Sequence, residues 1–203
     1  MAIITTKTGD KGYTSLGNTS VRKDNEIIIS LGKLDTLNAQ CGITISDLNE
    51  FKRENISIYS LNHIDFIISK LYNFQQILYN IGGYIHFKHC TLTDSLLEKI
   101  TNLEYSFDEN LLNMEEYIEE HSNSLNLDYF IRYPANKTSS LFLVSRLIRE
   151  LEVNYYEYAN NITNSYDLGK YFNRCSDYYY LLAIIIYVKS DIKLDNINLV
   201  KIN

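Results

Sequence analysis

Residues 137–160, "KTSSLFLVSRLIRELEVNYYEYAN", carry apolar side chains at alternating spacings of three and four residues. Side chains at these spacings lie along one face of an α-helix, and the repeat is typical of the seam of a helix bundle. Arg146 falls outside that face, whereas Arg149 and Glu150 lie near it. The stretch therefore predicts a long helix that packs against other helices along a stripe formed by Leu141, Val144, Ile148, Leu151, Tyr155 and Tyr158.

Four other segments predict helices of the same bundle. In residues 63–85 the apolar side chains again fall three or four positions apart, and Thr93 is a suitable N-cap for a helix that runs to about Leu103. The segment 167–189 is apolar on nearly all sides in its second half, so we expect it to be the central helix. The segment 25–46 is predicted to be a helix, although its isoleucine-rich start fits a strand equally well by propensity.

The segments between these helices are predominantly polar. Residues 47–61 predict a loop or a ragged helix end, and residues 104–128 predict a solvated helix followed by a linker, because they are rich in acidic side chains. Four to five helices with short connections make an all-α, up-and-down helix bundle the leading fold. At 203 residues, the chain 1–203 fits a single domain.

Composition excludes several classes of function. The formal net charge of −6 argues against a nucleic-acid-binding or polybasic membrane-binding surface. The longest apolar run, residues 178–188, is too short to span a membrane. Cys41, Cys90 and Cys175 are odd in number and unclustered, which favours a reducing compartment. Residues 1–20 contain no apolar signal core, so we expect a cytoplasmic protein without nucleic-acid or membrane partners.

The opening segment 6–17, "TKTGDKGYTSLG", combines glycines, lysines and hydroxylated residues with almost no apolar side chains. Glycines let backbone N–H groups turn inward, lysines supply positive charge and hydroxyls can ligate a metal ion, which together suit a polyphosphate. The order of these residues is not that of a P-loop. A flexible, solvated N-terminus explains the same composition, so both interpretations stay open at this point.

Residues 173–180, "NRCSDYYY", place polar and charged side chains at the start of the apolar run of the last helix. On a helix Asn173 and Asp177 are neighbours at i,i+4, and Arg174 can pair with Asp177 or with Tyr178. Charged groups this close to a core must be paired. The cluster is therefore either an internal salt bridge that ties the central helix to its neighbours or part of a functional site.

A short histidine-containing motif carries no predicted chemistry. His86, His89 and Cys90 lie close together in "HFKHC", but no second group of cysteine and histidine completes a tetrahedral metal site. The sequence therefore predicts no metal centre built by the protein itself.

Three motifs in this order resemble those of the ATP:corrinoid adenosyltransferases of the propanediol-utilisation type. That family opens with T-[KR]-T-G-D-x-G-x-T-S-L and a later Lys-Asp, and this chain has "TKTGDKGYTSL" at 6–16 and Lys23-Asp24. The family's G-x-x-D-x-L-N-x-x-x-G motif is matched by "GKLDTLNAQCG" at 32–42. Its closing N-R-x-S-D-Y-x-F-x-x-A motif is similar to "NRCSDYYYLLA" at 173–183.

The resemblance implies a fold, a reaction and an assembly. The fold would be an up-and-down five-helix bundle of the ferritin-like type, with an ordered N-terminal nucleotide-binding loop within residues 1–24. The enzyme would transfer the 5′-deoxyadenosyl group of ATP to the cobalt(I) of a reduced corrinoid, releasing triphosphate and forming adenosylcobalamin. Family members are homotrimers that bind ATP with its Mg²⁺, and the corrinoid (cobalamin), at subunit interfaces.

The resemblance also implies roles for individual residues. Arg174 and Asp177 would shape the nucleotide site, and Phe130, in a loose match to the family's F-I-x-P loop, would press on the bound corrinoid; these three are the predicted catalytic residues. Asp35 would pair with Arg146 across the subunit interface. ATP would be bound by Thr6, Lys7, Thr8, Gly9, Asp10, Lys11, Gly12, Tyr13, Thr14, Ser15, Lys23, Arg149 and Asn173.

One family motif is changed in this chain. Four residues after its first helix arginine the family carries R-R-x-E-R, and a count from Arg146 without gaps places other residues there: Glu150, Leu151, Val153 and Asn154. A one-residue deletion would recover Arg149 and Glu152, but such a shift turns the later side chains by about 100°. Either Arg149, Arg132 or Lys137 compensates for the change, or the affinity for ATP is low. The alternative to an active enzyme is a catalytically weakened protein of the same fold that binds corrinoid or ATP as a carrier or sensor.

Overall fold

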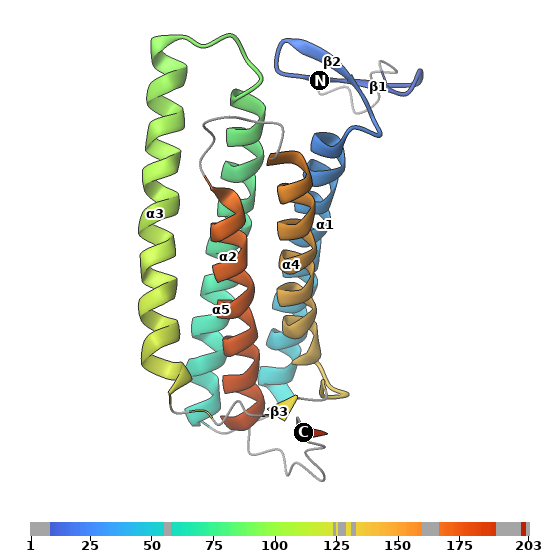
Figure 1. Ribbon diagram of the computed structural model, residues 1–203. Helices are drawn as coiled ribbons and strands as arrows, with labels where there is room; N and C mark the ends of the chain where they lie inside the picture. The colour runs from blue at the N-terminus through green and yellow to red at the C-terminus, as the bar shows by residue number, and fades with distance from the viewer. Residues whose placement is uncertain are drawn as a thin grey trace.

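The computed structural model describes residues 9–54, 58–123, 125, 129–130, 133–159, 167–189 and 200–201. These residues form five helices and two small antiparallel sheets, shown in Figure 1. The helices are α1 (Glu26–Glu54), α2 (Ile58–Phe87), α3 (Asp94–Ser122), α4 (Ser139–Ala159) and α5 (Leu168–Lys189). The paired strands are β1 (Tyr13–Leu16) with β2 (Thr19–Arg22), and β3 (Tyr129–Phe130) with β4 (Val200–Lys201). The predicted five-helix bundle is confirmed.

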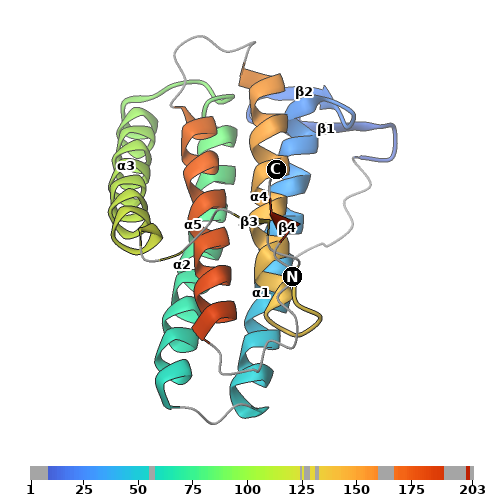
Figure 2. The same ribbon diagram turned by 60° about the horizontal axis from the view of Figure 1, so that its bottom comes forward.

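Successive helices run in opposite directions, so the bundle is of the up-and-down type (Figures 1 and 2). α4 packs extensively on both α5 and α1, and α2 packs on α1. α3 packs mainly on α5 and lies at the outer edge of the bundle in both views. The two helices that carry the predicted catalytic and arginine motifs, α5 and α4, are therefore direct neighbours.

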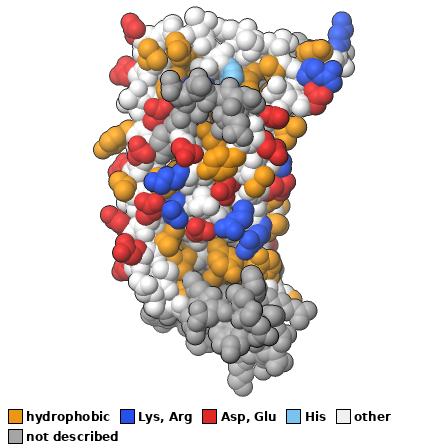
Figure 3. All heavy atoms as spheres, viewed as in Figure 1, with side chains coloured by type: hydrophobic (Ala, Val, Ile, Leu, Met, Phe, Trp, Pro, Cys, Tyr) orange, Lys and Arg blue, Asp and Glu red, His pale blue; other side chains and the backbone are white. Residues whose placement is uncertain are grey.

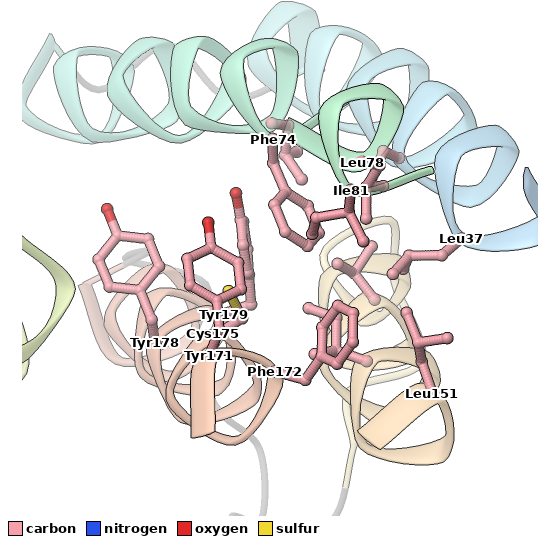
Figure 4. Packing of buried hydrophobic residues seen from close by; sticks show 14 of the residues in the cluster. Leu37, Phe74, Leu78, Ile81, Leu151, Tyr171, Phe172, Cys175, Tyr178 and Tyr179 are labelled. Carbon is pink, nitrogen blue, oxygen red and sulfur yellow. The ribbon is translucent and has the colours of Figure 1, made fainter. Parts of the chain in front are cut away.

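α5 is the central helix, as its sequence predicts. Every residue from Tyr178 to Tyr187 is buried except Tyr180, which is half-buried. Figure 4 shows side chains of α5 meeting those of α1, α2 and α4 in one cluster. The predicted stripe on α4 is buried from Leu141 to Tyr155, whereas the side chain of Tyr158 lies outside the described part of the chain.

α1 and α2 are longer than predicted. Most of the expected loop at 47–61 is helical, because the buried face of α1 continues through Leu48 and Phe51. The strand alternative for the start of α1 is wrong. Asn25 Oδ1 accepts a hydrogen bond from Ile27 N at 3.0 Å, and this N-cap starts a helix there.

α3 is one continuous helix. Thr93 caps it as predicted, since its Oγ1 accepts a hydrogen bond from Leu96 N at 3.3 Å. The predicted end near Leu103 is wrong, because the helix keeps a buried face through the acidic segment, with Phe107 and Met114 in the core.

Between Gly9 and α1 the chain forms a β-hairpin rather than a loop. Tyr13 pairs with Arg22 and Leu16 with Thr19. Leu16 is only 2% exposed and joins the hairpin to the hydrophobic core. None of the described helices combines the length and the apolar character that crossing a membrane requires.

Candidate active site

The first candidate group is the turn that precedes β1. Gly12 N donates a hydrogen bond to Gly9 O at 3.2 Å, and Lys23 N donates one to Gly12 O at 2.9 Å. A Cβ added to Gly9 would lie 2.7 Å from Lys23 Nζ, so the ammonium group rests against the backbone of the turn. Lys11, on the same turn, is exposed. The hairpin thus brings two predicted ATP-binding lysines and two predicted glycines to one place.

The tip of the hairpin docks on the turn between α2 and α3. Gly17 N donates a hydrogen bond to His86 Nδ1 at 3.4 Å. Asn18 N donates to His89 O at 3.2 Å, and Asn18 Nδ2 donates to Thr91 Oγ1 at 2.5 Å. A Cβ on Gly17 would overlap the carbonyl of His89, and its φ of +57° lies in the left-handed region that favours glycine. The histidine-containing motif therefore holds the hairpin in place.

Two electrostatic effects act on the hairpin. A hydrogen bond from Arg22, together with its charge, holds the pKa of the Asp24 carboxyl below its usual value. Their ion pair, with N···O 2.7 Å, neutralises the arginine and leaves the lysines as the charges available to an anion. Burial lowers the pKa of His89, and the nearby His86 lowers it further, which favours the neutral form of His89 where it meets the hairpin.

The second candidate group joins α4 and α5. Asp177 Oδ1 accepts a hydrogen bond from Arg149 at 3.1 Å, and Asp177 Oδ2 accepts one from Arg174 at 3.4 Å. Arg149 also lies 3.4 Å from Ser176 Oγ. The side chain of Arg149 is 50% exposed, so a ligand can reach it from solvent. Figure 3 shows Lys, Arg, Asp and Glu side chains gathered at mid-height over α4 and α5. The predicted Arg174–Asp177 ion pair is confirmed.

Two glutamates from other helices extend this cluster. Asn173 Nδ2 donates a hydrogen bond to Glu152 Oε1 on α4 at 3.1 Å. Arg174 Nε donates one to Glu115 Oε1 on α3 at 3.1 Å. The polar start of α5 is therefore held by contacts to the helices on both sides of it.

Residues 4–186 match the model of a protein family described as Cobalamin adenosyltransferase. This chain belongs to the cobalamin adenosyltransferase family. A curated relative, the corrinoid adenosyltransferase of Bacillus subtilis (strain 168), is 27% identical over 189 residues, which cover 92% of this chain and 88% of the relative. The family and the class of enzyme predicted from the motifs, an ATP:corrinoid adenosyltransferase, are confirmed.

Solved structures of a second relative show the same fold. A variant of the PduO-type ATP:corrinoid adenosyltransferase of Lactobacillus reuteri, complexed with cobalamin and ATP, is 21% identical and superposes with a TM-score of 0.69 over 92% of both chains. Another variant of that protein, complexed with ATP, is 20% identical with a TM-score of 0.68, over 92% of this chain and 95% of the other.

The residues that correspond to the arginine motif of a cobalamin adenosyltransferase lie on one helix of this chain, α4. α4 runs unbroken from Ser139 to Ala159, and Arg149 and Glu152 both contact α5. They are the two residues that a one-residue deletion would bring to the first and fourth positions of R-R-x-E-R. The position four residues earlier is then Ser145, which is buried, instead of Arg146. In that alignment Arg146 lies one residue after the position of the arginine that precedes R-R-x-E-R. A shift of one residue along a helix turns a side chain by about 100°.

Arg146 is held by tyrosines within the chain. Its Nε donates a hydrogen bond to Tyr133 OH at 2.6 Å, and its guanidinium lies 5.3 Å from the ring centre of Tyr180. Burial raises the pKa of Tyr180, whereas the charges of Arg146 and Arg149 act in the opposite direction. Asp35 is exposed and lines a cavity of about 440 Å³ between α1 and α2. A pair between Asp35 and Arg146 of two subunits stays a prediction.

Several of the remaining predicted residues lie outside the part of the chain that the structure describes. Thr6, Lys7 and Thr8 lie outside the described residues, as does Arg132. Phe130 has its backbone in β3, but its side chain lies outside the described part. Asp10 is exposed in the turn, and three predicted residues follow it on β1: Tyr13, Thr14 and Ser15.

Sequence reasoning missed the role of Glu115, which it assigned to a solvated acidic surface. A signal was present, because Glu115 follows the buried Met114 and so sits at the edge of the packed face of α3. An acidic residue at such an edge is a candidate partner for Arg174 on α5. Within the described ranges, no three His, Cys, Asp or Glu side chains gather in a way that could hold a metal ion.

Proposed function

We propose that this chain transfers the 5′-deoxyadenosyl group of ATP to the cobalt(I) centre of a reduced corrinoid such as cobalamin. A bond forms between cobalt and ribose C5′ while the C5′–O bond breaks, and triphosphate leaves with the electron pair of that bond. The observation that carries this proposal is the Asp177 carboxylate between Arg149 and Arg174, because it links an arginine of the family's closing motif on α5 to an arginine on α4. Fixed positive groups stabilise the charge that builds on a leaving triphosphate.

The hairpin is the proposed site of the triphosphate. Lys11 and the Lys23 ammonium beside the Gly9–Gly12 turn offer charge, and the turn offers backbone N–H groups. Thr14 and Ser15 on β1 add hydroxyls. These groups would hold the nucleotide so that its ribose C5′ faces the incoming corrinoid, which is the positioning that a displacement at carbon requires.

We assign Mg²⁺ to the nucleotide rather than to a protein cage. The donor set fits this arrangement, because the hairpin offers hydroxyls and the described residues hold no cluster of three acidic, histidine or cysteine ligands. Magnesium in such sites keeps several waters and is bound largely by the phosphates themselves. When bound, the ion would neutralise phosphate charge as the triphosphate leaves.

The cluster on α4 and α5 is the second proposed ATP contact. Asn173, oriented by Glu152, and Arg149, oriented by Asp177, are the side chains assigned to the nucleotide. Arg174 and Asp177 shape this part of the site by fixing one another. The result is a preformed group of donors that needs little rearrangement when ATP arrives.

The active site is proposed to lie between copies of the chain. The hairpin lies by the start of α1, on the side of the bundle away from α3, whereas the cluster spans α3, α5 and α4 (Figures 1 and 2). A site that uses both groups is therefore built most simply from two subunits, and the proposed homotrimer would supply such interfaces. In this assembly Asp35 would pair with Arg146 of a neighbouring subunit, and Phe130 would press on the corrinoid. The three free cysteines support a cytoplasmic location.

The test of the reaction is spectroscopic and anaerobic. Purified chain, MgATP and chemically reduced cobalamin are mixed, and the visible spectrum is followed for the alkylcobalamin product. We expect conversion at a rate proportional to protein concentration, together with release of triphosphate. No conversion by a chain that still binds ATP would reject the enzyme and leave the second candidate.

That second candidate is a carrier or sensor that binds ATP or corrinoid without efficient transfer. The observation in its favour is that two arginine positions of the motif hold other residues. Glu150 pairs with Lys33 on α1 at 2.6 Å, and Val153 is exposed. Fewer cations near the phosphates would weaken stabilisation of the leaving group. Measurable ATP affinity combined with absent turnover would identify this alternative.

A further inference from the structure

Glu115 differs from the other acidic residues near it on α3. Glu116 and Glu119 are exposed, whereas the side chain of Glu115 is only 35% exposed and reaches toward α5. Its carboxylate accepts the hydrogen bond from Arg174 Nε at 3.1 Å and lies 4.0 Å from Lys170 Nζ. Glu115 is therefore a specific partner of α5 and not part of a general solvated surface.

Beyond Arg174 the contacts continue to α4. Arg174 NH1 donates to Asp177 Oδ2 at 3.4 Å, and Asp177 Oδ1 accepts from Arg149 at 3.1 Å. Two carboxylates and two guanidinium groups thus alternate across three helices. Each carboxylate–arginine contact in the series leaves the next group less free to turn.

We propose that Glu115 is a positioning residue for the ATP site. It holds the Arg174 guanidinium from the α3 side, and Arg174 in turn orients the Asp177 carboxylate toward Arg149. The inference rests on the proposed function, because Arg149 matters here as a ligand of ATP. Glu115 itself touches neither substrate.

The geometry of the guanidinium explains the effect. It is a rigid plane with donors on several edges, and a carboxylate on the Nε edge fixes the direction of the remaining donors. Without Glu115, Arg174 is free to turn and to take both oxygens of Asp177 in a bidentate pair. Arg149 would then lose its 3.1 Å contact and keep the longer 3.4 Å contact to Ser176 Oγ. A less ordered Arg149 binds ATP less tightly.

A purely structural role for Glu115 would have different consequences. If the residue only fastened α3 to α5, its loss would lower the melting temperature and reduce the fraction of active protein. The affinities for ATP and for corrinoid in the folded fraction would stay as they were. A positioning role changes the affinity for ATP and leaves that for corrinoid unchanged.

The experiment uses the full chain with Glu115→Ala and Glu115→Gln, and with Glu116→Ala and Glu116→Gln as matched controls on the exposed side of the same helix. Titration calorimetry gives the Kd for MgATP without corrinoid, and steady-state assays give KM for each substrate. We expect Glu115→Ala to raise the Kd and KM for ATP about threefold to fivefold, the scale of a partly exposed ion pair. Glu115→Gln keeps an acceptor oxygen and should lie between Glu115→Ala and wild type.

The outcomes separate cleanly. A selective loss of ATP affinity with a graded rescue by glutamine and unchanged controls supports the inference. An ATP affinity equal to that of the Glu116 variants, or an equal loss for both substrates, overturns it. A wild-type chain that binds no ATP would overturn the proposed function as well. If Glu115→Ala does not fold, the near-isosteric Glu115→Gln variant decides alone. A Kd for MgATP above that of Glu116→Gln supports the inference, and an equal Kd overturns it.

Discussion

The side-chain amide of Asn173 on α5 donates a hydrogen bond to Glu152 on α4 at 3.1 Å. This contact joins the first residue of the family's closing motif to the acid of its arginine motif. An asparagine amide offers donors on one side and an acceptor on the other, so a carboxylate partner determines which way it points. Glu152 therefore fixes the direction in which the Asn173 amide points.

Asn173→Ala is expected to weaken ATP binding about tenfold, because it removes a hydrogen bond to a charged ligand. Glu152→Gln should have a smaller effect in the same direction, since glutamine can orient the amide either way. The measurement is the Kd for MgATP by calorimetry, with helix content checked by circular dichroism. Glu157→Gln, an exposed change on the same helix, is the control. Unchanged affinity in both variants would remove this cluster from the ATP site.

Lys11→Ala and Lys23→Ala are each expected to weaken ATP binding, because Lys11 belongs to the turn assigned to the triphosphate and the Lys23 ammonium lies against that turn. The loss should be about threefold to tenfold at low salt and should shrink as salt screens the interaction. Titrations at two ionic strengths test this. Lys99→Ala, at an exposed position of α3, is the control. Equal affinity in all three variants would place the phosphates elsewhere.

Gly17→Ala should undock the hairpin. The substitution adds about 1–2 kcal/mol of left-handed backbone strain and also forces a clash with the His89 carbonyl. Gly12→Ala is the matched comparison, because Gly12 has a φ of +79° but open space around its Cβ. We expect Gly17→Ala to lower the melting temperature and the protection of hairpin amides from exchange more than Gly12→Ala does. Equal effects would mean that the docking contact contributes nothing.

Stability should fall as the pH drops below about 6.5, the ordinary pKa of histidine. Because the pKa of His89 is lowered in the folded chain, the unfolded chain binds a proton at a higher pH than the folded chain does. This proton binding stabilises the unfolded state as the pH falls. For one proton the slope is at most about 1.4 kcal/mol per pH unit. His89→Gln should flatten the dependence of melting temperature on pH between neutral and mildly acidic buffers. An identical slope in wild type and variant would assign it to other groups.

The three thiols should react at different rates. Burial raises the pKa of Cys41 to about 12 and also raises that of Cys175. Cys90 is only partly buried, at the turn where the hairpin docks. A disulfide reagent at neutral pH should therefore modify Cys90 first in the native protein and the other two only on unfolding. Rapid modification of Cys41 would show that the bundle opens there.

Much of the fold could be predicted from the sequence because long apolar stripes identify helices directly. The stripe from Leu141 to Tyr155 and the apolar second half of α5 both behave as predicted. The hairpin could not be recognised, since its strands are four residues long and carry a single buried anchor, Leu16. Its strand pairing depends on the turn at Gly17 and on support from a distant part of the chain.

The candidate site was predictable within one helix and not between helices. Spacing alone placed Arg174 next to Asp177 on α5. Spacing does not say which faces of different helices meet, so the sequence could mark Glu115 as an acid at the edge of the packed face of α3 but could not single it out as the partner of Arg174. The same limit applies to Arg149, whose contact with Asp177 on α5 is visible only in the folded chain.

The docking of the hairpin tip also determines an order of assembly. Its hydrogen bonds join residues 69 and 73 positions apart in the chain, to a turn that exists only once α2 has formed and folded back along α1. Contacts that close such long loops form after local ones. A refolding chain should therefore regain its helical signal first and its affinity for ATP later. A nascent chain released before His86 would hold all the residues of the hairpin and none of the residues on which its tip docks.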